Sequence, residues 1–311
     1  MVYFAPLEGI TGYVFRNAYE QYYGGVERYF TPFITPHTKK NMDARERRDI
    51  LPENNRGIHL IPQVLTNKSE ELISISKELR EYGYEEINLN IGCPSKTVTA
   101  KGKGAAFLGE PATLERFFDE YFSSSDVKLS IKTRLGMWEV SETERLFSIF
   151  EKYPFTEVIV HARLGSEFYG GTPHQDIFEE YAKNSGHSMC YNGDINSPEQ
   201  LQELQSRWPY CEKYMLGRGL VARPGMLIVD SVCGNKLEIE RFRDFHDSLL
   251  NGYIGYLSGD RDVLFKMKEL WSYWIRQFPG EEKLFKQIKK SNNLNEYNII
   301  VNKLLNKQED M

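Results

Sequence analysis

The sequence predicts an α/β protein that folds as a (β/α)8 TIM barrel followed by a small C-terminal helical bundle. Strand-like runs alternate with helix-like stretches along most of the chain, a pattern typical of right-handed βαβ units and a parallel sheet. Eight strand-like runs are present, which favours closure into a barrel over an open sheet. The length of 311 residues leaves room for a barrel of about 250 residues and a second, smaller unit. A doubly wound open sheet is the alternative.

The expected strands and helices follow one another in order. The run from Glu86 to Ile91, for example, alternates polar and apolar residues as a strand does. Strands are expected at Val2–Ala5, Arg28–Thr31, Leu60–Val64, Ile87–Ile91, Lys128–Lys132, Glu157–Val160, Met189–Tyr191 and Tyr214–Leu216. Helices are expected between most of them, at Ser69–Tyr82, Pro111–Tyr121, Ser141–Lys152, Gln175–Lys183 and Pro198–Ser206.

The pattern changes after about Cys233, beyond which no convincing strand is found. Apolar residues from Val263 to Phe278 recur at spacings of 3, 4 and 7 positions, which indicates an amphipathic helix. Further helices are expected at Glu240–Leu249, Glu281–Lys290 and Leu294–Asn306. We therefore expect two domains, a barrel over residues 1–235 and a helical domain over residues 236–311.

The composition is that of a soluble globular protein without a membrane segment. No apolar run approaches the roughly 20 residues that a bilayer requires, and the N-terminus lacks the features of a signal peptide. The four cysteines contain no CxxC pair and are too sparse for a disulfide framework. We therefore expect a cytoplasmic protein with reduced thiols. The histidines show no metal-ligand spacing, so no metal is expected.

The charge is unevenly distributed along the chain. A net charge of −5 argues mildly against a nucleic-acid partner. From residue 236 onward, however, 13 Lys and Arg stand against 12 Asp and Glu, so the negative charge belongs to the barrel. Lys283, Lys286 and Lys290 fall on one face of an expected helix, with Lys266 and Lys268 upstream. A solvated helix surface is the simpler interpretation of these lysines by themselves.

Polar residues follow the expected strands at their C-terminal ends, where barrel enzymes carry their chemistry. They are Pro6, Gln63, Asn90, Cys93, Lys132, Arg134, His161, Asn192, Gly193, Gly217 and Arg218. Each could singly have a structural role; Cys93, for instance, could be a small buried apolar residue. A complete ring of such residues favours a functional site. Cys190, Cys211 and Cys233 are interpreted as structural.

Two glycine-bearing loops follow the seventh and eighth strands. They are Asn192-Gly193-Asp194 and Gly217-Arg218-Gly219. Barrels often bind a phosphate at this place, because glycine lets backbone N–H groups approach an anion and arginine adds two donors. The loops therefore predict a cofactor that carries a phosphate.

The motifs resemble, in order, those of the bacterial-type tRNA-dihydrouridine synthases, and the resemblance covers essentially the whole chain. Asn90-Ile91-Gly92-Cys93-Pro94, with the glycine-rich loop after it, is the most specific piece. The other pieces are Ala5-Pro6-Leu7, Thr11, Phe15-Arg16, Lys132-Thr133-Arg134, His161-Ala162-Arg163, Asn192-Gly193-Asp194 and Gly217-Arg218-Gly219. Residues 164–171 depart from the family pattern, which weakens inference about the RNA contacts of that loop.

The resemblance implies a barrel that binds FMN and a C-terminal helical domain that binds tRNA. It implies reduction of the C5–C6 double bond of a uridine in tRNA with NADPH, and no obligate protein partner is evident. Cys93 would act as general acid, while Asn90, Arg134, Lys101 and Lys103 would contact the substrate. The flavin would be bound by Ala5, Pro6, Leu7, Gln63, Lys132, His161, Asn192, Gly193, Asp194, Gly217 and Arg218.

The role of Cys93 suits its chemistry, because a thiol with an ordinary pKa near 8.5 is mostly protonated at neutral pH. Two other functions are kept open. A flavin-dependent barrel oxidoreductase acting on a small pyrimidine-like substrate would need no basic helical tail. A non-catalytic RNA-binding relative would not require Cys93 and Lys132, so the presence of these residues argues against it.

Overall fold

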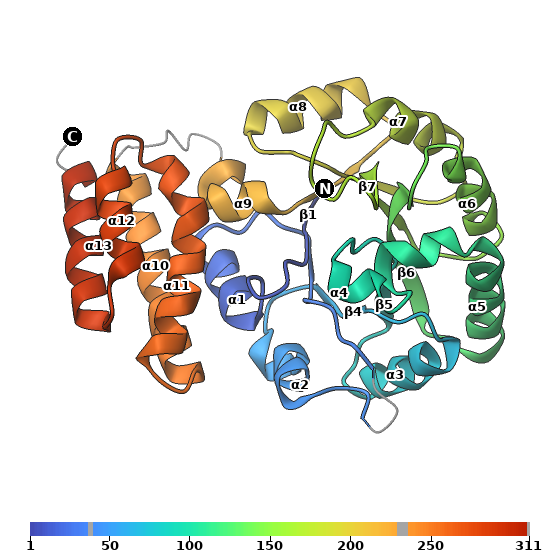
Figure 1. Ribbon diagram of the computed structural model, residues 1–311, viewed down its shortest axis with the longest axis horizontal. Helices are drawn as coiled ribbons and strands as arrows, with labels where there is room; N and C mark the ends of the chain where they lie inside the picture. Colours follow the sequence, from blue (N-terminus) through green and yellow to red (C-terminus); the bar gives the residue numbers. More distant parts are fainter. Residues whose placement is uncertain (37–39, 229–235, 310–311) are drawn as a thin grey trace.

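The computed structural model describes residues 1–36, 40–228 and 236–309. A ring of parallel strands with helices around it forms one side of the molecule, and four helices pack against each other beside it (Figure 1). This confirms the predicted α/β barrel with C-terminal helices. Cys233 and His37 lie outside the described residues, and the domain boundary expected after residue 235 falls at the end of the segment 229–235, which is also outside them.

The barrel sheet has nine strand segments, all paired in parallel, in the order β3-β2-β1-β9-β8-β7-β6-β5-β4. The two segments at the ends of this order, β3 and β4, are consecutive in the chain and are separated by Pro62 alone. Proline has no N–H to donate to the ladder, so it divides one strand into two segments. The strand expected at Leu60–Val64 is thus interrupted at one residue, and the barrel closes there. The segments are β1 (Val2–Phe4), β2 (Arg28–Phe30), β3 (Leu60–Ile61), β4 (Gln63–Val64), β5 (Glu86–Asn90), β6 (Lys128–Gly136), β7 (Val158–Leu164), β8 (Met189–Asn192) and β9 (Lys213–Leu216).

The expected barrel helices are confirmed to within a few residues. They are α3 (Ser69–Glu81), α5 (Pro111–Ser124), α6 (Glu142–Phe150), α7 (Gln175–Asn184) and α8 (Pro198–Arg207). Sequence reasoning missed α1 (Tyr13–Tyr22), α2 (Ala44–Ile50), the short α4 (Lys96–Thr99) and α9 (Arg218–Ala222), and the 3-10 turns η1 (Pro52–Asn54), η2 (Gly104–Gly109), η3 (Pro224–Leu227) and η4 (Ile275–Gln277).

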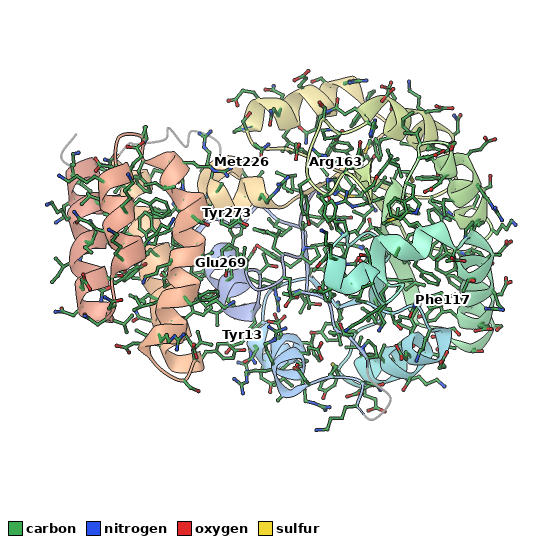
Figure 2. All side chains as sticks on the ribbon, in the orientation of Figure 1. Tyr13, Phe117, Arg163, Met226, Glu269 and Tyr273 are labelled. Atoms are coloured by element: carbon green, nitrogen blue, oxygen red, sulfur yellow. The ribbon has the colours of Figure 1, made fainter. Side chains whose placement is uncertain are left out.

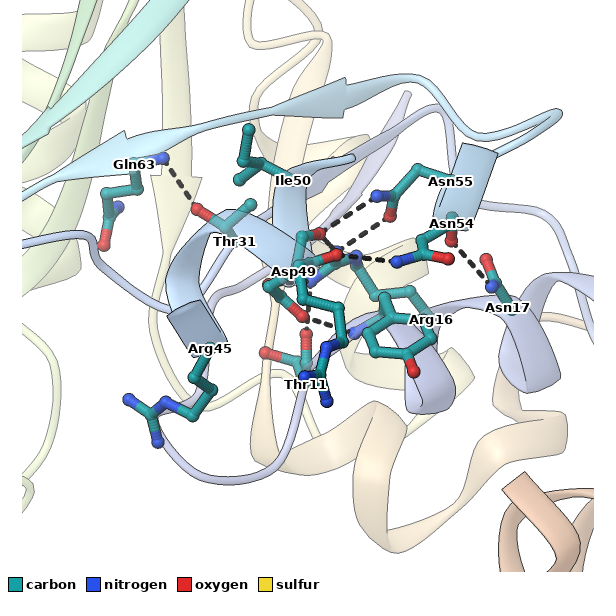
Figure 3. A network of polar contacts seen from close by, with 12 residues as sticks. Thr11, Arg16, Asn17, Thr31, Arg45, Asp49, Ile50, Asn54, Asn55 and Gln63 are labelled. Carbon is teal, nitrogen blue, oxygen red and sulfur yellow. Dashed lines mark hydrogen bonds and ion pairs between the residues drawn. The ribbon is translucent and has the colours of Figure 1, made fainter. Parts of the chain in front are cut away.

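Polar contacts rather than an apolar stripe hold α1 to α2 (Figure 3). The guanidinium of Arg16 is buried and donates to the carbonyl of Thr11, to the carboxylate of Asp49 at 2.9 Å and to the side chain of Asn55 at 2.8 Å. The N-terminus of α2 is closed by a capping box between Asp43 and Glu46. α2 buries Ile50 alone and so gives little hydrophobic periodicity, whereas α1 buries Phe15, Ala18 and Tyr19 at helical spacing and was missed despite this pattern.

The C-terminal helices are α10 (Lys236–Tyr256), α11 (Asp260–Trp274), α12 (Glu282–Lys290) and α13 (Leu294–Glu309), and no strand is found among their described residues. α10 packs on α1, and α11 packs on α9. A Cβ at Gly252 would lie 2.6 Å from the side chain of Val14, so the glycine permits this close approach of α10 to the barrel. Among the described residues, no helix is both long and apolar enough to cross a membrane.

Candidate active site

A cavity opens at the C-terminal ends of the barrel strands. Its lining includes all of the site residues predicted from the sequence except Lys101 and Lys103. These are Ala5, Pro6, Leu7, Gln63, Asn90, Cys93, Lys132, Arg134, His161, Asn192, Gly193, Asp194, Gly217 and Arg218. Seven barrel strands, or the loops that follow them, therefore contribute residues to one place, as the barrel topology requires.

Buried amide side chains connect the floor of the cavity to the Cys93 loop. Asn90 accepts hydrogen bonds from the backbone N–H groups of Gly92 (3.1 Å) and Cys93 (2.9 Å). Its own amide donates to Gln63 Oε1 at 2.8 Å, and Gln63 donates to Asn88 Oδ1 at 2.8 Å. Because every amide is oriented by the next, Asn90 positions the backbone that carries Cys93.

The Cys93 thiol lies half-buried where β5 leads into the loop. Burial raises its pKa above the ordinary value, although a backbone hydrogen bond from Ser95 and the charges of Lys132 and Arg134 act in the opposite direction. The net shift is upward, so the thiol is protonated at neutral pH. A reactive thiolate would require the reverse shift.

The side chain of Lys132 extends from β6 to the end of β8. Its Nζ donates to Asn192 Oδ1 at 3.0 Å, and Asn192 donates in turn to the carbonyl of Met215 at 2.7 Å. Burial, followed by the nearby Arg134 charge, lowers the pKa of Lys132 to about 8. An anion in the cavity would relieve this unfavourable environment for the ammonium group.

His161 is held as a neutral donor. Arg163 Nη1 lies 3.2 Å from His161 Nε2, and a guanidinium can only donate, so Nε2 accepts and the ring proton is assigned to Nδ1. Burial, and then the charges of Arg134 and Lys132, lower the pKa of His161 well below its ordinary value. A neutral imidazole with its proton on Nδ1 therefore lines a cationic cavity.

The two glycine-bearing loops lie against each other. A Cβ on Gly219 would collide with the carbonyl oxygen of Ile195, so only glycine lets the loop after β9 approach the loop after β8 this closely. Asp194 forms an ion pair with Arg163 and another with Arg218, the latter at 2.9 Å. These contacts fix the guanidinium of Arg218 at the edge of the cavity.

Arg134 is fully buried at the wall of the cavity. It donates from Nε to the carbonyl of Gly92 and from Nη1 to the carbonyl of Leu164, both at 2.8 Å. The first of these bonds fixes the backbone next to Cys93. Arg134 thus joins the loop after β5 to the end of β7.

Tyr169 was missed by sequence reasoning. Its ring lies under two guanidinium groups, with centroid distances of 4.7 Å to Arg218 and 5.5 Å to Arg134, and 5.9 Å from the ring of His161. Its side chain is nevertheless 53% exposed. It belongs to the 164–171 segment, where no periodicity or familiar motif could have identified it. Glu8 and Phe33 also line the cavity without having been predicted.

Lys101 and Lys103 are not among the residues that line the cavity. Lys103 Nζ lies 3.7 Å from the carboxylate of Glu71 on α3, while Lys101 is exposed. The structure therefore does not bring these two predicted substrate contacts to the site. Within the described part of the chain, no group of three or more His, Cys, Asp or Glu residues is arranged to hold a metal ion.

Comparison with known proteins agrees with this geometry. The family model described as dihydrouridine synthase (Dus) matches residues 3–308. The chain is 25% identical to tRNA-dihydrouridine synthase B of Shewanella oneidensis over 223 residues, which cover 71% of this chain and 67% of that protein. It is 24% identical to the probable tRNA-dihydrouridine synthase of Staphylococcus epidermidis over 296 residues, covering 91% of this chain and 87% of the relative. The chain therefore belongs to the dihydrouridine synthase family.

Proposed function

We propose that this protein is a tRNA-dihydrouridine synthase, which reduces the C5–C6 double bond of a uridine in tRNA. The names of its relatives support the substrate, and the family model supports the reaction. The observation that carries the proposal is the Cys93 thiol, kept protonated by burial at the edge of a cavity rich in cations. It provides an acid beside a site suited to an anionic cofactor.

The residues present fit FMN, which we propose as the cofactor with NADPH as reductant. Lys132 and Arg218 provide positive charge, and the neutral Nδ1–H of His161 provides a donor. The glycine at position 217 leaves the start of the last loop without a side chain, so that its backbone can approach an anion closely. The residues that would hold the flavin are Ala5, Pro6, Leu7, Gln63, Lys132, His161, Asn192, Gly193, Asp194, Gly217 and Arg218.

The chemistry divides between cofactor and protein. FMN, when bound and reduced, supplies the hydride that C6 of the uracil ring receives. Cys93 Sγ–H gives its proton to C5, so that two new C–H bonds replace the double bond, and the thiolate then regains a proton from solvent. Asn90 and Arg134 keep the backbone of Cys93 in place through their contacts at Gly92.

The RNA must deliver its uridine into the cavity. A base has to leave its stack to reach the strand ends of a barrel, at a cost of a few kcal/mol. We propose that the helices of residues 236–311 form a tRNA-binding domain that offsets this cost through contacts to the RNA, with the cytoplasm as the site of action. Lys101 and Lys103, which lie outside the cavity, would contact RNA beyond the flipped nucleotide.

Analysis of tRNA nucleosides tests the proposed function. Cells lacking the gene should lose dihydrouridine at a defined tRNA position, and purified protein with FMN and NADPH should restore it in their tRNA. Reduction of free uridine or uracil at a higher kcat/KM than tRNA would contradict the proposal. It would indicate instead a flavin oxidoreductase acting on a small pyrimidine.

A further inference from the structure

A second cavity lies next to the active-site cavity, between the barrel and the C-terminal helices. The two cavities share the lining residues Tyr169, Asp194, Asn196, Arg218 and Gly219. The remaining wall of the second cavity comes from the end of α9 and from α11 and η4, which pack against α9. It consists of Ala222, Arg223, Tyr273, Arg276 and Gln277. We call it the arginine cleft.

The arginine cleft carries an excess of positive charge. Arg218, Arg223 and Arg276 line it, whereas Asp194 is the one carboxylate of its described lining. Asp194 is already engaged by Arg218 and by the buried Arg163. Within the described part of the chain, neither Arg223 nor Arg276 has a carboxylate within the 4.0 Å of an ion pair. Among the described residues, neither guanidinium group has an ion-pair partner in this cleft; the carboxylate on which the charge of Arg223 acts, Glu199, lies outside the lining.

A groove continues on the other side of the active site. A third cavity shares Glu8, Pro32 and Phe33 with the active-site cavity and is bounded by Phe265 and Lys266 of α11. α11 thus contributes to the two outer cavities, and Figure 2 shows Glu269 and Tyr273 on the side of this helix that faces the barrel. From Asp262 to Arg276 this side extends about 20 Å at 1.5 Å per residue.

This arrangement favours a polymer over a small cofactor. A dinucleotide with its reactive ring in the active-site cavity needs space on one side of that cavity only. A nucleotide within a chain has neighbours on both sides and would use both outer cavities. Phosphodiesters are the anionic groups that such a chain brings, and guanidinium groups bind them through two donors each.

We infer that Arg223 and Arg276 bind the RNA backbone phosphates next to the flipped uridine. The inference rests on the proposed function and makes it more specific. These arginines lie beyond Arg218, which is proposed to bind the flavin, and would hold the strand on one side of the target nucleotide. They act as positioning residues, because they lie outside the cavity that holds Cys93.

The test is the double variant Arg223→Gln/Arg276→Gln in the full-length FMN-loaded protein. Its binding to an unmodified tRNA transcript is measured between 50 and 200 mM salt, as is the reduction of the flavin by NADPH. Each lost phosphate contact lowers the log–log salt slope by about 0.7–0.9, so the slope should fall by about 1.4–1.8. The KM for NADPH should not change. Each single variant, expected to give half the effect, is used if the double variant unfolds.

The matched control is Arg80→Gln/Lys128→Gln, which removes two positive charges far from the cleft. Lys128 begins β6, and Arg80 pairs with Asp126 just before it, so both lie at the end of the barrel opposite the active site. The control should keep the wild-type salt slope. A wild-type slope in the cleft variant overturns the inference. An unchanged slope with a raised KM for NADPH also overturns it and assigns the cleft to the dinucleotide. If the wild-type protein forms no dihydrouridine in tRNA, the proposed function fails whatever the slopes.

Discussion

Gly104 lies against the backbone of Cys93. A Cβ at position 104 would approach the Cys93 carbonyl oxygen to less than 3.0 Å, and the φ of Gly104 is +60°. The next residue, Ala105, donates its backbone N–H to the same carbonyl at 2.9 Å. The glycine-rich loop after Cys93 therefore returns onto the cysteine and fixes its position, with no side chain between them.

Replacing Gly104 with alanine should displace the Cys93 loop. The left-handed backbone alone costs about 1 kcal/mol or more, and overpacking against a carbonyl adds about 1–3 kcal/mol. Gly57→Ala is the matched control, because its φ is +78° but nothing lies within 4 Å of its added Cβ. Urea unfolding should show the larger loss for Gly104→Ala. Equal losses would mean that the loop does not depend on this contact.

The low pKa of Lys132 predicts pH-dependent flavin binding. Below its pKa of about 8 the ammonium group is charged and attracts an anionic cofactor, and above it the attraction is lost as the proton leaves. The dissociation constant of FMN should be constant near pH 7 and rise by up to about tenfold per pH unit above pH 8. The phosphate of FMN, which titrates near pH 6, does not interfere in this range.

The control for this prediction is Lys132→Met. It should bind FMN more weakly at pH 7 and show no pH dependence between pH 7 and 9.5, as measured by quenching of flavin fluorescence. A wild-type protein whose FMN affinity is the same at pH 7 and 9.5 would rule out a role of the Lys132 charge in binding.

Arg218 should be needed to retain the flavin. Arg218→Ala removes a charge-assisted contact worth about 1.5–3 kcal/mol, so the dissociation constant of FMN should rise about 10-fold to 150-fold. Arg207→Ala is a matched control, because Arg207 is similarly exposed, pairs with Glu179 and stacks on Trp208 away from the cavity. Equal retention by both variants would place the phosphate of the cofactor elsewhere.

The sequence predicted the barrel because its strands are short, buried and regularly separated by amphipathic helices. It also predicted which residues end the strands, and in a barrel these ends must converge. Cys93, Lys132 and His161 could be found in this way without knowledge of any contact. The C-terminal helices were found from their apolar spacing, which reflects an aromatic core that includes Trp271 and Trp274.

Features that depend on contacts between distant segments could not be predicted. Tyr169 becomes a site residue only because Arg134 and Arg218 stack on it. The two lysines of the 101–103 loop appeared free to reach a substrate, yet Lys103 pairs with Glu71 of α3. The ion pairs of a loop residue depend on which helix packs beside it, and the local sequence does not encode that.

The five lysines of the C-terminal helices that the sequence analysis named divide into two groups. Lys266 and Lys268 are half-buried and donate to the carbonyls of Gly9 and Ser291, so they are structural contacts. Lys283, Lys286 and Lys290 are exposed on α12, which packs on α11 and α13. Of these five lysines, only the three exposed ones remain available to contact RNA.

Changing Lys283, Lys286 and Lys290 together to Gln should flatten the salt dependence of tRNA binding and raise the KM for tRNA. Each phosphate contact that is lost lowers the slope by about 0.7–0.9. Stability should change by less than about 0.5 kcal/mol per residue, because the side chains are exposed. Reduction of the flavin by NADPH serves as the internal control. A wild-type slope would show that this face is only solvated.

The most direct test of the account is the separation of the two half-reactions in Cys93→Ala. Reduction of the bound flavin by NADPH should proceed at the wild-type rate, because it needs no acid at this position. Transfer to the tRNA uridine should slow by about 10²–10⁴-fold, the usual contribution of a positioned general acid. If Cys93→Ala instead forms dihydrouridine in tRNA at the wild-type rate, Cys93 is a structural thiol and the proposed mechanism is wrong.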